Sequence, residues 1–265
     1  KAEGTSYYCT DVDVLQTQTI VTNTTWGNVS VANKITIEEG ATLTITGLIG
    51  CADAEKLIIK EGGQLIHNNA GVKATLEKEI EGYGSTNESW YTISSPLMGN
   101  VALSDVESLI PTTNNYDLYR YDEPTSVWQN VKQTSNNFAN LENGRGYLYA
   151  NEYDATLSFA GELNGDDVTY HLSKTENIVL SGFHLIGNPF THNIYKGVGA
   201  AIDDNNLAAG YYTLSDAGAW GAKISDDIPI APGQGILVKT SKEGDVKIKK
   251  TNTQPSQKSN ADILA

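Results

Sequence analysis

The chain has 265 residues, 39% hydrophobic and 19% charged, and its 18 basic against 32 acidic residues give a net charge of −14. This acidity disfavours binding to nucleic acid and to anionic membrane surfaces, because both carry negative charge. The sequence contains no apolar run long enough for a transmembrane helix, so we expect no membrane insertion. The abundant Thr, Val, Ile and Tyr residues, the 25 Gly and the single Met favour an all-β fold.

The two cysteines, Cys9 and Cys51, both lie near the N-terminus. We expect them to form one disulfide that closes a loop of about forty residues and stabilises the fold by roughly 4 kcal/mol. Two buried free thiols are the alternative. The chain opens at Lys1 in polar sequence, without an initiator Met or a signal-type apolar segment. We therefore expect a processed or trimmed form.

A short repeat marks the first segment, residues 1–86. Residues 35–45 match residues 57–67 at an offset of 22 (57 − 35), with aliphatic residues at alternate positions and a glycine between the two runs. This pattern predicts stacked coils of a β-solenoid-like segment, with possible flanking strands at 29–31 and 72–80. We expect His67, at the end of the second unit, to be a rim or surface residue. Two clear coils are too few for a catalytic β-helix.

A longer duplication follows. Residues 90–97 (WYTISSPL) match residues 183–190 (FHLIGNPF) at an offset of 93 (183 − 90), and the glycine pair 144/146 matches the pair 233/235 at an offset of 89 (233 − 144). We predict two tandem antiparallel β-sandwich-like units, at 87–178 and 179–250, and a polar tail or linker at 251–265. Within the first unit, a capping box at 104–107 predicts a short helix before Pro111. A hairpin that includes residues 168–172 is assigned to the same unit.

Each copy contains a predicted hairpin with a tryptophan in its second strand. The aromatic residues Tyr121 and Trp128 in the first copy, and Tyr212 and Trp220 in the second, are the candidate ligand-binding residues. A tryptophan on a strand packs across to its neighbour or, when its face is exposed, forms a platform for a sugar ring. The packing role is favoured for both tryptophans.

The remaining motifs are weaker candidates for a binding or catalytic site. The glycine pairs precede strands and lack a third glycine, so they indicate strand entry or a bulge and not a phosphate loop. His184 and His192 lack a zinc-type spacing and are expected to be a strand residue and a loop residue. Asp203 and Asp204 form a weak calcium candidate. The sequence contains no nucleophile elbow or other catalytic motif, and we assign no catalytic residue and no cofactor.

Taken together, the runs WYTISSPL, DLYRYDEPTSVWQNV, LENGRGYLYA, FHLIGNPF and IAPGQGILVK resemble the β-rich regions near the C-terminal end of large secreted Bacteroidetes proteins. Similar regions often precede a sorting domain recognised by the type IX secretion system, and their proteins are described as adhesins, hemagglutinin-like proteins or uncharacterised. The resemblance implies export and display at the cell surface. The sequence ends at Ala265 before any such sorting domain, and we expect it to be one piece of a longer protein.

Three functions follow as hypotheses. The first is a non-catalytic secreted or cell-surface β module for adhesion or structural display, whose partner is an unknown host or cell-surface protein or glycan. The second is a carbohydrate-binding module that uses exposed Trp and Tyr residues. The third is an accessory part of a glycan-degrading enzyme.

Overall fold

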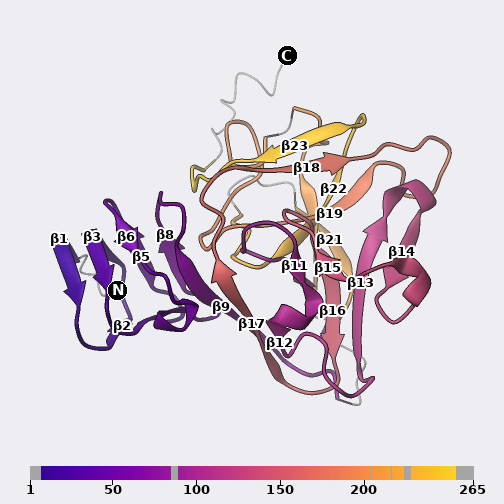
Figure 1. The fold of residues 1–265 in the computed structure, drawn as a ribbon. Helices are drawn as coiled ribbons and strands as arrows, with labels where there is room; N and C mark the ends of the chain where they lie inside the picture. The colour runs from indigo at the N-terminus through magenta and orange to yellow at the C-terminus, as the bar shows by residue number, and fades with distance from the viewer. Residues whose placement is uncertain (1–6, 85–88, 204, 216, 224–227, 255–265) are drawn as a thin grey trace.

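The computed structural model describes residues 7–84, 89–203, 205–215, 217–223 and 228–254, and the side chains of residues 7–10 are outside this description. In this part of the chain the protein is all-β, without an α-helix, and the described residues contain no helix long and apolar enough to cross a membrane. Its helical turns are short 3-10 segments: η1 (Ala54–Lys56), η2 (Leu103–Asp105), η3 (Glu123–Thr125) and η4 (Thr134–Asn136). A β-solenoid-like segment stands at one side of the molecule (Figure 1).

The solenoid-like segment consists of two parallel sheets to which the chain contributes strands in turn. Sheet A contains β1 (Tyr7–Val14), β3 (Thr24–Val31), β5 (Thr42–Ile45), β6 (Ile49–Gly50) and β8 (Gln64–Ile66). Sheet B contains β2 (Gln18–Ile20), β4 (Ile35–Ile37), β7 (Leu57–Ile59) and β9 (Lys73–Ile80), and continues into β17 (Ala155–Glu162) and β12 (Val106–Glu107).

The repeat at offset 22 produces this stacking. Its aliphatic residues point inward from both sheets, and Ile35, Leu43, Leu57 and Leu65 are completely buried. Gly40 and Gly62 have positive φ angles of 74° and 75° at the corners, where a side chain would be strained. The predicted flanking strands are present as parts of β3 and β9. The prediction of a β-solenoid-like segment is therefore confirmed.

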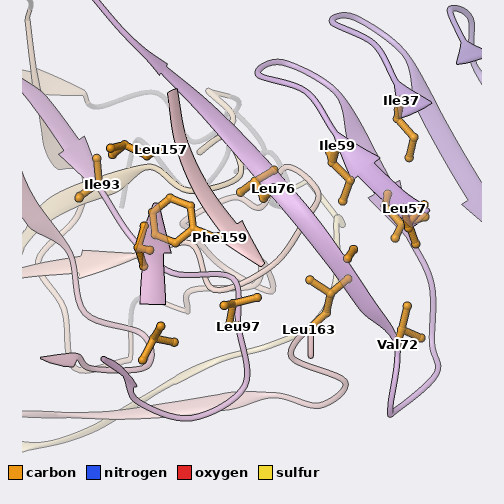
Figure 2. Close-up of a cluster of buried hydrophobic side chains, with 14 of the residues drawn as sticks. Ile37, Leu57, Ile59, Val72, Leu76, Ile93, Leu97, Leu157, Phe159 and Leu163 are labelled. Atoms are coloured by element: carbon orange, nitrogen blue, oxygen red, sulfur yellow. The ribbon is translucent and has the colours of Figure 1, made fainter. Parts of the chain in front are cut away.

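The sheet and the hydrophobic core of the solenoid-like segment continue beyond β9, its last parallel strand. β9 pairs in parallel with β7 on one side and antiparallel with β17 along all eight residues on the other. One hydrophobic core accordingly extends from Val14 in the solenoid to Leu163. Figure 2 shows this continuity, with Ile37 and Ile59 of the solenoid followed by Leu76 of β9 and then Phe159 and Ile93. A second core begins at Val168 and ends at Ile248.

Two four-stranded antiparallel sheets follow, and their strand orders correspond. The first has the order β10 (Tyr91–Ile93), β16 (Tyr147–Asn151), β13 (Tyr116–Asp122) and β14 (Val127–Asn130). The second has the order β19 (Phe183–Gly187), β22 (Gly235–Lys239), β20 (Tyr211–Leu214) and β21 (Trp220–Lys223). Each sheet therefore begins with the proline motif and places next to it the strand that follows a glycine pair.

Two smaller pairings complete the fold. β11 (Val101–Ala102) pairs with β15 (Asn140–Leu141), and β18 (Val168–Leu172) pairs with β23 (Gly244–Ile248). The assignment of residues 168–172 to the first unit remains a prediction. β18 pairs with β23 and leads into the second proline motif, as β9 pairs with β17 and leads into the first motif. The predicted boundaries at residues 86 and 178 remain predictions, and of the predicted tail only residues 251–254 are described.

The two four-stranded sheets contact each other through the glycine pairs. The Gly187 amide donates to the Gly144 carbonyl at 2.9 Å, and the Ser94 amide donates to the Gly233 carbonyl at the same distance. These bonds are reciprocal, because 94 and 187 correspond at offset 93, as 144 and 233 do at offset 89. Each glycine pair thus enters a strand, as predicted, and also binds the proline motif of the other four-stranded sheet.

The short helix predicted from the capping box does not form. Residues 103–105 make a 3-10 turn with no side-chain cap, and Val106 and Glu107 continue as strand β12 against Phe159 and Ser158. The Ser104 hydroxyl donates to Asp105 and so does not cap a helix. Pairing with the free edge of β17 buries Val106, which outweighs the local helical signal.

The predicted disulfide is wrong, because strand register separates the two cysteines. Cys9 lies opposite Trp26 on one edge of β3, whereas β6 pairs with the other edge and brings Cys51 level with Val31. Five residues of strand separate these levels, or about 16 Å, whereas bridged cysteines have Cα atoms within about 7 Å. Cys51 is a free, buried thiol that donates to the Asp53 carbonyl at 3.2 Å.

We expect a reducing agent to leave the midpoint of thermal unfolding unchanged, because there is no cross-link to break. Burial raises the pKa of the Cys51 thiol and outweighs the hydrogen bond to the Asp53 carbonyl, which lowers it, so the thiol should react slowly with thiol reagents. In a Cys9→Ser variant, Ellman's reagent should label Cys51 slowly in buffer and rapidly in urea. A lower unfolding midpoint on reduction of the native chain would contradict this assignment.

Candidate functional site

Three of the four predicted ligand-binding aromatic residues lie together where the hairpins of the two four-stranded sheets meet. Tyr121 is opposite Trp128 across the hairpin, with ring centroids 5.1 Å apart, and only 4% of its surface is exposed. Trp128 stacks on Trp220 with centroids 6.5 Å apart and planes inclined by 19°. Both tryptophans are half-buried. The structure therefore brings these three rings together and turns ring faces toward each other.

Tyr212 lies apart from this stack. It packs against Phe183 with centroids 6.0 Å apart and is 37% exposed. The ammonium of Lys239 lies 5.4 Å from the centre of the Phe183 ring. The corresponding pair in the first sheet is Trp90 and Tyr119, at 6.2 Å. Among the described residues, the two exposed aromatic side chains are Tyr212 and Tyr153, the latter 58% exposed on a different segment.

The calcium candidate is only partly described. Asp204 lies outside the described residues. The Asp203 carboxylate accepts the amide of Asn205 at 3.2 Å and is 4.0 Å from the ammonium of Lys249. Among the residues that the structure describes, no cluster of three or more His, Cys, Asp or Glu side chains is arranged to hold a metal ion.

The histidines divide into an exposed one and three buried ones. His184 is in β19 and His192 in a loop, as expected. His67 is only 2% exposed, so its predicted rim or surface position is wrong. The loop after the second proline motif covers it, since the Leu65 amide donates to Thr191 and the Thr191 hydroxyl donates back to Leu65. His67 and His192 each have one buried ring nitrogen without a partner among the described residues.

Stability should therefore fall in mild acid. Burial, followed by the nearby charge of Lys250, lowers the pKa of His67 to about 3 and that of His192 to about 4. An unfolded histidine titrates near 6.5, so the unfolded chain binds more protons below that pH. The contribution of each buried, neutral histidine to the free energy of unfolding is fully present above pH 6.5. It decreases as the pH falls toward the pKa of the folded state, and about 2 kcal/mol per histidine is lost near pH 5.

Urea titrations at a series of pH values measure this effect. A His67→Gln/His192→Gln double variant should have a flatter profile between pH 6.5 and 4. His171 is the matched control, because it is exposed and paired with Asp245. Replacing it by Gln should leave the acid loss in place. An equal slope in the native chain and the double variant would contradict the prediction.

A groove of about 300 Å³ lies on the outer face of sheet A, and the sequence did not identify it as a site. Its floor has two rows of side chains across β3, β5 and β8: Asn23, Thr42 and Gln64 in one row, and Thr25, Thr44 and Ile66 in the other. Its wall contains Asn193, Tyr195 and Asn252. The signal available in the sequence was the alternation in Thr42-Leu43-Thr44, which places both hydroxyls outside when Leu43 is inside.

This groove is lined without charge. Its described lining includes no Asp, Glu, Lys, Arg or His, although the chain has a net charge of −14. Three other hollows in the described part of the protein all contain acidic residues, among them Asp166, Asp203 and Glu162. Within the described residues, the hydroxyls of Thr25, Thr42 and Thr44 have no hydrogen-bond partner. The arrangement can bind an uncharged polar ligand through hydroxyl and amide groups.

No protein-family model, no curated protein and no solved structure matches this chain.

Proposed function

We propose that the protein is a non-catalytic, secreted or cell-surface β module that serves in adhesion or structural display. One observation carries this proposal: sheet B extends from β2 at the edge of the solenoid through β9 to β17 and β12, over a shared hydrophobic core. A continuous hydrogen-bonded sheet transmits load between its ends and keeps distant surfaces in fixed relation. Such a body is suited to holding a binding surface away from its attachment point.

The second part of the chain supports a finer proposal about its construction. We infer two tandem copies of one β unit, comprising β9–β17 and β18–β23. The matching strand orders, the corresponding partners of β17 and β23 and the reciprocal glycine contacts all support it. Because each copy covers the other, neither needs to present an open sheet face to solvent.

Export to the cell surface is the other part of the proposal, and the resemblance to regions of secreted Bacteroidetes proteins supports it. Intact producer cells should be labelled by antibodies to the protein and should lose the epitope on protease treatment. Beads coated with the full chain should attach to host or bacterial cells, through a surface protein or glycan, more than albumin-coated beads do. An epitope that appears only after lysis, together with bead attachment at the albumin level, would contradict the proposal.

Glycan binding through the tryptophans is a weaker candidate, because Trp128 and Trp220 present faces to each other. A Trp128→Leu/Trp220→Leu variant should lower the free energy of unfolding by about 2 kcal/mol through lost aromatic packing. Bead attachment, measured below the unfolding temperature of the variant, should not change. Loss of attachment without loss of stability would instead favour the tryptophan platform.

A further inference from the structure

We propose that the uncharged groove on sheet A binds a neutral oligosaccharide, as part of a cell-surface or extracellular glycan. The proposal names a ligand class for the adhesive role above and therefore rests on it. The carrying observation is that unpartnered hydroxyl groups, amide groups and a tyrosine line one groove whose lining has no charge.

The floor has the regularity that a chain of sugar rings requires. Thr25 and Thr44 are register partners, and Thr42 is the partner of Gln64 on the next strand. Neighbouring strands are about 4.8 Å apart, so each row presents polar groups at a constant spacing across three strands. A threonine hydroxyl can both donate and accept, and an amide carries donors beside an acceptor, which matches the dual character of sugar hydroxyls.

Strand pairing holds these groups in place before any ligand arrives. The Thr42 amide donates to the Asn23 side chain at 3.0 Å, which fixes the Asn23 amide group at the start of the first row. The threonine side chains are β-branched and therefore have few rotamers to lose. Binding would cost little conformational entropy in the protein, and this preorganisation is what weak polar recognition needs.

The wall comes from the segment that follows the second proline motif. This segment is tied to β8 by the two Leu65–Thr191 bonds and by the Asn193 amide, which donates to the Gln64 side chain at 2.8 Å. The Tyr195 hydroxyl accepts from Gln254. An aromatic side chain at the edge of a polar groove offers an apolar surface to the C–H face of a sugar ring.

The first copy has no such wall. At the offset of 93, Tyr195 corresponds to Ala102 and Thr191 corresponds to Met98, whose side chain is 57% exposed. The two copies keep the residues that shape the proline motif but differ in the residues that reach the solenoid. The wall is therefore an addition to the fold at the place where the groove lies.

The charge and composition of the groove favour a neutral glycan over an acidic polysaccharide or a protein partner. An acidic polysaccharide would be repelled by a protein of net charge −14 and would find no basic side chain among the described lining residues. A protein partner of ordinary composition would meet little of the hydrophobic surface that dominates protein interfaces, because Ile66 is the only aliphatic residue among the described lining residues. Neutral sugars need only the hydroxyl, amide and tyrosine groups that are present.

Isothermal titration of the full chain with a panel of short neutral gluco-, manno-, galacto- and chito-oligosaccharides tests the proposal. At least one should bind, and polygalacturonate and alginate oligosaccharides should not. A Thr25→Val/Thr42→Val/Thr44→Val variant should weaken that binding about tenfold, because each lost hydrogen bond is worth roughly a few-fold in affinity. Valine keeps the branched shape and strand preference of threonine.

The opposite sheet supplies the matched control. Thr19 and Thr36 are register partners that point outward from sheet B and do not line the groove. A Thr19→Val/Thr36→Val variant should bind as the native chain does. Tyr195→Leu probes the wall independently and should also weaken binding, which keeps the test decisive if the triple variant does not fold.

The proposal is overturned if no neutral oligosaccharide binds, if only anionic ones do, or if the groove and control variants bind equally. These results concern the groove alone, because they are obtained in solution with purified protein. If coated beads still attach to cells after the groove fails, adhesion uses another surface and the proposed function stands. If neutral oligosaccharides bind but the protein is absent from cell surfaces, the groove stands and the proposed function fails.

Discussion

Replacing Gly187 by alanine is expected to lower the free energy of unfolding by about 3 kcal/mol, since overpacking at a rigid contact costs this much. A Cβ at position 187 would lie 2.2 Å from the Ser94 Cβ, 2.7 Å from its hydroxyl and 2.9 Å from the Arg145 carbonyl. Ser94 donates its amide to Gly233, and Arg145 adjoins Gly144, which accepts the Gly187 amide, so neither can move away without disturbing the contact between the sheets. Urea unfolding monitored by tryptophan fluorescence measures the loss.

Gly221 is the matched control. It also lies in a strand of the second four-stranded sheet, but a Cβ there meets no atom within 4 Å. Gly221→Ala should change the free energy of unfolding by less than about 0.5 kcal/mol, or raise it slightly through a smaller unfolded-state entropy. If the two alanine variants are equally stable, the proposed close contact between the sheets is wrong.

A double variant locates the clash. Ser94→Gly removes the side chain that a residue 187 methyl group would meet, so Ser94→Gly/Gly187→Ala should be more stable than Gly187→Ala alone. The recovery should be partial, because Ser94 also donates to the Asn188 carbonyl at 2.8 Å. Positions 94 and 187 correspond at offset 93, and there is room for one Cβ between them. This explains why one copy has serine and the other glycine.

Replacing Glu123 by alanine should also cost about 3 kcal/mol. Glu123 is in the turn of the first hairpin and is 1% exposed. Its carboxylate accepts the amides of Thr175 and Gly182, both at 2.8 Å, and the hydroxyls of Ser173 and Thr175. Alanine would leave these donors without their acceptor and would release the segment that leads into the second proline motif. Thermal unfolding by circular dichroism should show a lower midpoint.

Glu123→Gln is the matched control for shape. Its side-chain oxygen can still accept both amides, and its NH₂ group can donate to the two hydroxyls, which are able to accept. It should therefore be clearly more stable than Glu123→Ala at neutral pH. If the two variants are equally destabilised, the charge of the carboxylate matters more than its hydrogen-bond geometry.

Glu123 also predicts a second acid transition, below that of the histidines. Burial alone would raise the pKa of Glu123, but the amides of Thr175 and Gly182 and the two hydroxyls lower it to about 2. The unfolded carboxyl titrates near 4.5, so this contribution is present above pH 4.5 and is lost as the pH falls toward 2. The difference in unfolding free energy between the native chain and Glu123→Gln should therefore shrink as the pH falls across that range. A constant difference would contradict the low pKa.

Local sequence patterns were sufficient for the elements whose partners are close in the chain. Alternating aliphatics around Gly40 and Gly62 predicted the coils, because a stacked coil buries its aliphatic residues against the next coil. The hairpin that pairs Tyr121 with Trp128 followed from a turn between two short β-prone runs. The glycine pairs indicated strand entry, and β16 and β22 begin at or just after their second glycine.

Predictions failed where the partner was distant. The disulfide between Cys9 and Cys51 looked plausible from composition alone, but the register of β1 and β6 on opposite edges of β3 separates the two residues. The capping box at Ser104 was overridden by the edge of β17, and His67 was buried by a loop that lies more than one hundred residues later in the chain. Each outcome depended on which distant strand or loop covered the residue.

The all-β class, the solenoid-like coils and the repeated proline and glycine motifs could be read from the amino acids alone, because hydrophobic periodicity and turn chemistry act over a few residues. The tertiary structure was needed to show that β9 pairs with both the solenoid strand β7 and the later strand β17. It was also needed to show that the proline motifs form contacts between the two four-stranded sheets. It also decided that Thr25, Thr42 and Thr44 share a groove with Tyr195. The physical reason is that burial and hydrogen bonding between distant segments depend on register and packing, which a local pattern does not specify.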